Sequence, residues 1–113
     1  MQCITVPADA RIKVTVPEEA ASELEISNAA LSIEKEIPEK GRVVLYLAPI
    51  NESGKEGTAI AIAPLTVGKS ESVKVDFRLL PGNQVVLSTK GDKIDVVVTG
   101  FIETLEQVIV ETL

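Results

Sequence analysis

Residues 72–79 read Ser72-Val-Lys-Val-Asp-Phe-Arg-Leu79, with polar and apolar side chains alternating at every position. Successive side chains of a β-strand point to opposite faces of its sheet. The apolar residues at 73, 75, 77 and 79 would therefore lie on one face and the four polar residues on the other. The stretch predicts an antiparallel strand that buries one face in a core and leaves the other in water.

The same period of two recurs along the chain and predicts further strands. Shorter alternating stretches are residues 11–16, 23–26 and 31–34. Other runs are apolar on both faces, namely 43–48, 58–63 and 94–98. We expect such strands to lie in the centre of a sheet, or to have their outer face covered by another layer or by a neighbouring subunit.

Turn residues separate these runs at short intervals. Pro81-Gly82 can occupy the central positions of a type II turn, because glycine accepts the positive φ required at the second of them. Gly91-Asp92 predicts another turn, and residues 51–57 predict an exposed loop. With strands roughly every 8–12 residues, we expect residues 1–113 to form a single all-β domain, an antiparallel β-sandwich or jelly roll of about eight strands.

The composition indicates an aliphatic core. The 113 residues include 15 Val, 11 Ile and 10 Leu, but only three aromatic residues, Tyr46, Phe77 and Phe101. Val and Ile are stiff at χ1 and fit a pleated sheet better than a helix. We expect the three aromatic side chains to anchor the core, because each can bury ~150–250 Å².

The formal net charge of −6 disfavours two classes of partner. The field of such a chain repels phosphate backbones and anionic membrane surfaces, so we expect neither nucleic acid nor a membrane as a partner. No apolar run approaches the ~20 residues of a membrane helix, and we expect no signal peptide.

Side chains suited to catalysis or metal binding are scarce. The chain has no histidine, and its single cysteine, Cys3, cannot build a structural zinc site alone. Neither glycine-rich phosphate-binding motif occurs. We therefore expect no enzymatic activity, no cofactor and no metal. The carboxylate pairs are interpreted as solvated surface: Glu18/Glu19, Glu34/Glu36, Glu52/Glu56 and Asp92/Asp95.

The segment 101–113 stays apolar to its last residue. Chain ends are usually polar and frayed, so we expect this segment to be the final strand of its own sheet or an arm that contacts another subunit. A helix would gather several of its apolar residues on one side, but the β-branched residues favour a strand over 108–112. We expect a symmetric homo-oligomer whose interface uses Phe101, Ile102, Leu105, Val108, Ile109, Val110 and Leu113.

The stretch Leu79-Leu-Pro-Gly-Asn-Gln-Val-Val-Leu-Ser-Thr-Lys-Gly-Asp-Lys-Ile-Asp-Val-Val-Val-Thr-Gly-Phe-Ile-Glu103 contains a turn, an alternating strand, a second turn and a Val-rich strand. In this order of features it resembles the closing segment of short β-sandwich proteins in tailed-phage particles. The resemblance implies a virion structural protein, either a head decoration or cement protein or a head–tail accessory protein. Its partners would be other virion proteins, and it would be found in a virion or in the cytoplasm.

The alternative is a different class, an acidic oligomeric chaperone or adaptor of the nucleoplasmin-like sandwich type. Such a protein would bind basic proteins through its carboxylates. These proteins usually carry a long acidic tract, and this sequence has none. A small enzyme or a sugar-binding domain, the third possibility, would need side chains that the chain scarcely has.

Overall fold

The computed structural model describes residues 2–32, 39–103 and 107–113, and in this part of the chain there are nine β-strands. Their bounds are β1 (Gln2–Val6), β2 (Arg11–Thr15), β3 (Leu24–Leu31), β4 (Arg42–Ile50), β5 (Ile60–Thr66), β6 (Ser72–Leu79), β7 (Gln84–Gly91), β8 (Val96–Phe101) and β9 (Ile109–Thr112).

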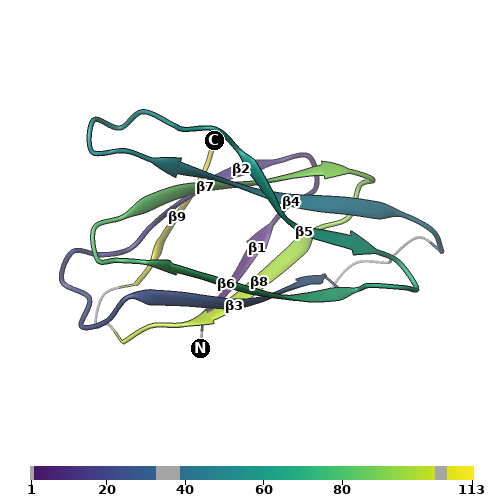
Figure 1. The fold of residues 1–113 in the computed structure, drawn as a ribbon, viewed down its shortest axis with the longest axis horizontal. Coiled ribbons are helices and arrows are strands. Elements are labelled where there is room, and N and C mark those ends of the chain that lie inside the picture. The colour runs from purple at the N-terminus through teal and green to yellow at the C-terminus, as the bar shows by residue number, and fades with distance from the viewer. Residues whose placement is uncertain (1, 33–38, 104–106) are drawn as a thin grey trace.

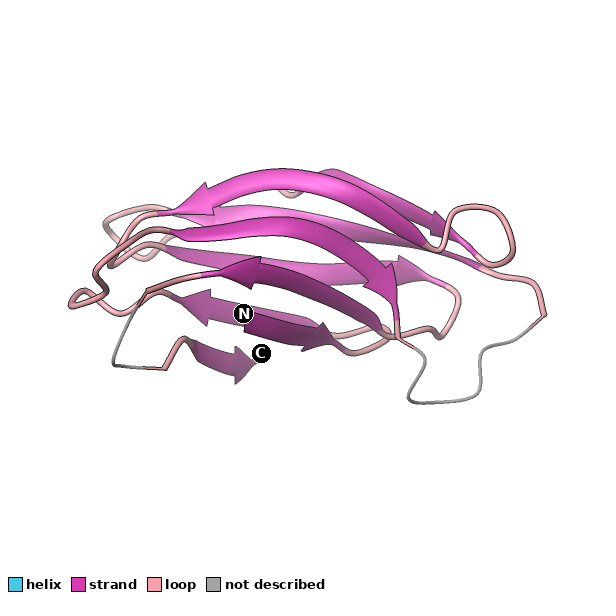
Figure 2. Ribbon diagram, turned by 90° about the horizontal axis from the view of Figure 1, so that it is seen from below, coloured by secondary structure: helices cyan, strands magenta, loops and turns pink. Residues whose placement is uncertain are grey.

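The strands form two antiparallel sheets that pack face to face. One sheet has four strands in the order β1-β8-β3-β6, and the other has five in the order β5-β4-β7-β2-β9. Most strands run between the two ends of the molecule, where the loops gather (Figure 1, Figure 2). The expected all-β antiparallel sandwich is therefore confirmed, with nine described strands where about eight were expected.

Aliphatic side chains of both sheets meet in the core. Leu45, Leu65 and Leu87 enter it from the five-stranded sheet, and each is 1% exposed or less. Leu24 enters from the opposite sheet and is also fully buried. Each such side chain contributes ~1.5–3 kcal/mol relative to an exposed one, so this layer is the main source of stability.

The alternating stretch Ser72–Leu79 forms β6, as predicted. Its polar residues are exposed, and Val73, Val75 and Phe77 pack against the core. These three side chains are only half-buried, because β6 is an edge strand with β3 as its one neighbour in the sheet. Burial is complete only at Leu79, the last residue of the strand.

Strand β3 changes phase along its length. Leu24 and Ile26 face the core in its first half. Ala29 and Leu31 do so in its second half, although their positions are odd and not even. The register with both neighbouring strands shifts between Ile26 and Asn28, where a β-bulge inserts one residue. The strand therefore contains most of the predicted stretch 23–26 but ends at Leu31, the first residue of the predicted stretch 31–34, whose residues 33 and 34 lie outside the described residues.

The runs that are apolar on both faces have different positions. Strand β4 is central in its sheet, and β8 is central in the other. On the outer face of the five-stranded sheet, Ala48 of β4 pairs with Val86 of β7, and each is only 2% exposed although neither belongs to the inner core. Strand β5 is an edge strand whose Ile60 is 56% exposed, so its cover by another subunit stays a prediction.

The expectation that all three aromatic residues anchor the core is wrong for Phe101, which is 60% exposed, and for Tyr46, which is not part of the core. Phe101 is the last residue of β8, and the preceding Gly100 is the residue that faces inward. Phe77 packs against the core, as expected. Tyr46 lies on the outer face, where the Lys90 ammonium is 5.4 Å from its ring centroid.

Candidate functional site

Four loops meet at one end of the sandwich, on the left in Figure 1. They join β2 to β3, β4 to β5, β6 to β7 and β8 to β9. The β2–β3 and β6–β7 loops exchange backbone hydrogen bonds, from Val16 N to Asn83 O at 3.0 Å and from Gly82 N to Val16 O at 2.9 Å. Ala21 N also donates to Glu103 O at 2.8 Å, which ties in the residues that follow β8.

We call this end the acidic end, meaning loop residues 16–23, 51–59, 80–83, 102–103 and 107–108. These residues include six carboxylates and one cation, Lys55. The described loops at the opposite end, 7–10, 32, 39–41, 67–71 and 92–95, have five carboxylates and three lysines. Among the described loops, the negative charge is therefore less compensated at the acidic end than at the opposite one. The six carboxylates of the acidic end are Glu18, Glu19, Glu23, Glu52, Glu56 and Glu103.

Two of these carboxylates form ion pairs with arginine side chains. Glu23 lies 3.2 Å from Arg78, and Glu56 forms an ion pair with Arg11. The other four make no ion pair within the described part of the chain. Four exposed, uncompensated negative charges at one end attract a cationic partner over a distance of about one Debye length.

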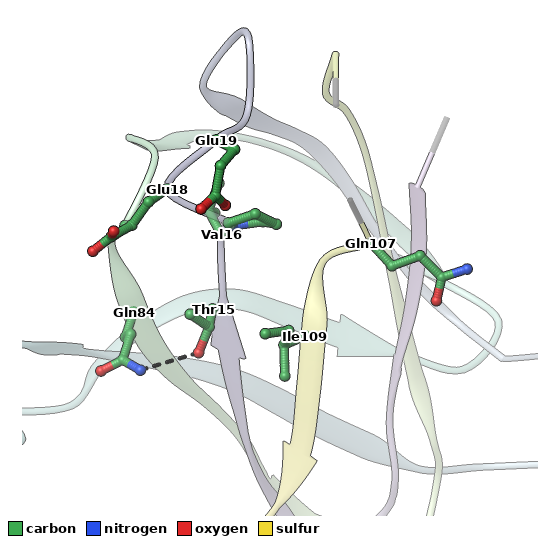
Figure 3. A pocket seen from close by; sticks show the side chains of 9 residues that line it. Thr15, Val16, Glu18, Glu19, Gln84, Gln107 and Ile109 are labelled. Atoms are coloured by element: carbon green, nitrogen blue, oxygen red, sulfur yellow. Dashed lines mark hydrogen bonds between the residues drawn. The ribbon is translucent and has the colours of Figure 1, made fainter. Parts of the chain in front are cut away.

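A groove of about 790 Å³ opens at the acidic end, beside the end of β2. One wall is the β2–β3 turn, with Glu18 and Glu19 at its rim. The groove is also lined by Gly82 in the β6–β7 loop, by Gln84 at the start of β7 and by Ile109 at the start of β9. The ends of three strands and residues of three loops, including Gln107 before β9, thus build one concavity (Figure 3).

Local backbone geometry fixes the rim of the groove. Ala20 N donates to Pro17 O at 3.2 Å and closes a turn in which Glu18 and Glu19 are the central residues. Gly82 has a φ of +86°, as the predicted Pro-Gly turn requires. A Cβ at Gly82 would lie 3.4 Å from Glu18 Cγ, an ordinary contact, so the positive φ and not lack of space favours glycine here.

The floor of the groove is a row of paired residues from three strands. Thr15 pairs with Gln84 on one side and with Ile109 on the other. Gln84 Nε2 donates to Thr15 Oγ1 at 3.1 Å, and the side-chain oxygen of Gln84 is turned away from this bond (Figure 3). Glu19 points its carboxylate back toward Val16. Oxygen acceptors and an aliphatic surface therefore lie side by side.

The candidate interface residues do not gather in one patch. Phe101 is exposed at the end of β8 in the four-stranded sheet. Ile109 and Val110 are exposed in β9 of the other sheet, on opposite faces of that strand. Ile109 belongs to the groove, whereas Val110 pairs with the buried Val14 and so faces the core side. Val110 is nevertheless 45% exposed, as the other residues of β9 are, because β9 is the edge strand of its sheet.

The remaining candidate interface residues also differ in exposure. Ile102 and Val108 are half-buried and pack against the chain's own core. Leu113 is 57% exposed. Leu105 lies outside the described residues.

Two of the sequence's carboxylates serve the fold. Asp92 Oδ2 accepts a hydrogen bond from Arg42 N at 2.7 Å, and Asp95 Oδ1 accepts one from Ala8 N at 2.8 Å. Glu34 and Glu36 lie outside the described residues. Within residues 2–32, 39–103 and 107–113, no three metal-ligating side chains cluster, and no helix is long and apolar enough to cross a membrane.

Together, the two packed sheets, the acidic end and the groove define a small all-β sandwich domain. Its family follows from the sequence: the Nucleoplasmin-like domain model matches residues 3–103, and the chain belongs to this family. The match covers both sheets from β1 to β8.

Solved structures share the fold. The core of Drosophila NLP is similar with a TM-score of 0.64 and 18% sequence identity, over 91% of this chain and 97% of that one. That structure is described as providing insight into pentamer formation and histone binding by the Drosophila protein. A search of curated proteins found no match to this sequence.

The expectation of a tailed-phage virion protein is wrong. The family match spans residues 3–103 and includes the whole segment Leu79–Glu103 on which the phage resemblance rested. That segment forms β7 and β8 with their turns, an arrangement that many unrelated sandwiches share. The expected roles were capsid decoration, cement or head–tail accessory protein, with virion partners and a virion location. These expectations rested on the phage resemblance and are therefore also wrong. The family match favours the alternative, the nucleoplasmin-like chaperone.

Proposed function

We propose that this protein is an oligomeric chaperone or adaptor that binds basic proteins of the histone class at its acidic end and catalyses no reaction. The observation that carries the proposal is the imbalance of six carboxylates against one lysine in the described loops of that end. Family membership supports it, and so does the histone binding named for the Drosophila protein of the same fold.

Assembly of several copies is part of the proposal. A ring of copies would bring several acidic ends together and multiply the attraction for a basic partner. The pentamer formation named for Drosophila NLP supports such a ring. For the contact between copies we propose the β9 side of the sandwich, where Val110 exposes an apolar side chain on the core side of its sheet.

Two measurements test this function. Light scattering on the purified chain should give a mass several times the 12.0 kDa of one copy. Titration with core histones should show saturable binding, and titration with an acidic protein of similar size should show none. A 12.0 kDa particle at micromolar concentration would refute assembly, and equal binding of acidic and basic proteins would refute selectivity by charge.

A further inference from the structure

The groove differs from the rest of the acidic end because its carboxylates adjoin the exposed aliphatic side chain of Ile109. Glu18 and Glu19 are exposed at its rim and have no cation of their own within the described residues. Val16 is fully buried beneath them, and Ile109 is 49% exposed on the other side of the floor. A side chain with an apolar stem and a positively charged tip would complement both Ile109 and the rim carboxylates.

Lysine and arginine side chains have this form. Their methylene stems pack on apolar surface while the charged head stays among polar groups. In the groove the stem would lie along Ile109 and Thr15, and the head would reach Glu19, whose carboxylate points back toward Val16. Glu18, which points outward in Figure 3, adds its charge at the rim. The side-chain oxygen of Gln84, which its bond to Thr15 leaves free, supplies a further acceptor.

The groove is also preorganised. The acidic turn is closed by its own Ala20–Pro17 hydrogen bond, and the neighbouring loop is held by the bond from Gly82 N to Val16 O. A site whose backbone is already held in place loses less conformational entropy when a ligand enters. We propose that the groove is a specific site for one lysine or arginine side chain of a basic protein partner, an inference that rests on the proposed function.

A pair of double variants tests the site with the full chain. Glu18→Gln with Glu19→Gln removes two charges from the rim, whereas Glu52→Gln with Glu103→Gln removes two charges from the same end outside the groove. All four side chains are exposed and make no ion pair within the described residues, so both variants keep the fold. Folding is checked by urea unfolding.

The probe is a fluorescent peptide of lysine, glycine and serine, and its affinity is measured by anisotropy. We expect the rim variant to lose about tenfold in affinity and the control variant about twofold, because only the rim carboxylates make charge-assisted contacts in the groove. Equal losses would overturn the site while leaving the proposed function intact. Failure of the unmodified chain to bind the peptide or core histones would overturn both.

A second readout locates the peptide. The Ile109 methyl signals should shift in NMR spectra when the lysine peptide is added, and those of Ile60, which is exposed on β5 outside the groove, should not. A peptide with norleucine in place of lysine keeps the stem and lacks the charge, so it should shift neither. An equal shift of Ile109 with norleucine would overturn a site for cations.

Discussion

At the scale of single residues, β3 approaches β8 so closely that Gly100 has no room for a side chain. A Cβ at Gly100 would lie 2.2 Å from the carbonyl oxygen of Glu25, a backbone atom that cannot move without breaking the sheet. We expect Gly100→Ala to lower the free energy of unfolding by about 1–3 kcal/mol, as other overpacking changes do. Urea denaturation measures this loss.

A matched glycine gives the control for this prediction. Gly57 lies in an exposed loop. A Cβ at this position would meet a side-chain atom, Cγ of Pro49 in β4, at 3.3 Å. Gly57→Ala should therefore cost clearly less than Gly100→Ala. Similar costs for the two variants would show that the close approach in the sheet is not what requires glycine at position 100.

The residues of the groove show what the sequence can and cannot predict about a site. Glu18 and Glu19 stand out in the sequence as a carboxylate pair, but a pair on an unknown surface is best interpreted as solvated. Their proximity to Gln84 and Ile109 depends on β2 pairing with both β7 and β9. Contacts between strands so distant in sequence are set by the topology, which no local pattern encodes.

At the scale of elements, period-two alternation predicted the strands well because burial on one face imposes it. It predicted less where the backbone departs from a regular strand, and the bulge after Ile26 is the clearest case. The exposed Phe101 is another, since the alternation in β8 that places Gly100 inward turns the aromatic ring outward. Hydrophobicity alone does not tell on which face of a sheet a residue lies.

Two edge strands of the five-stranded sheet allow a test of the proposed contact between copies. Val110 on β9 and Ile60 on β5 are exposed by 45% and 56%. We expect Val110→Asp to lower the mass found by light scattering, because it places a charge in an apolar interface. Ile60→Asp adds the same charge at the opposite edge and should leave the mass unchanged. Loss of assembly only in Ile60→Asp would move the contact to β5.

At the scale of the whole molecule, net charge and its distribution carry different information. The formal net charge of −6 can be read from the sequence, but this number does not show that the uncompensated carboxylates lie at one end of the molecule. That distribution arises because the connections of an antiparallel sandwich alternate between its two ends. Glu18, Glu52 and Glu103, which are far apart in the sequence, are thereby brought to the same end without a continuous acidic tract.

The two proposed kinds of contact should respond oppositely to salt. Binding at the acidic end is electrostatic between exposed groups, and the Debye length falls from about 10 Å at 0.1 M to about 3 Å at 1 M salt. We therefore expect the affinity for core histones to fall at least about tenfold between 0.05 and 0.5 M salt. Contacts through apolar side chains such as Val110 are not screened, so the mass of the oligomer should stay constant over the same range. Light scattering and a binding titration at each salt concentration measure both, with lysine-acetylated histones as a control whose weaker binding should depend less on salt. Subunits that separate before the partner is released would show that the copies are held together by charge, and the apolar contact at β9 would then be wrong.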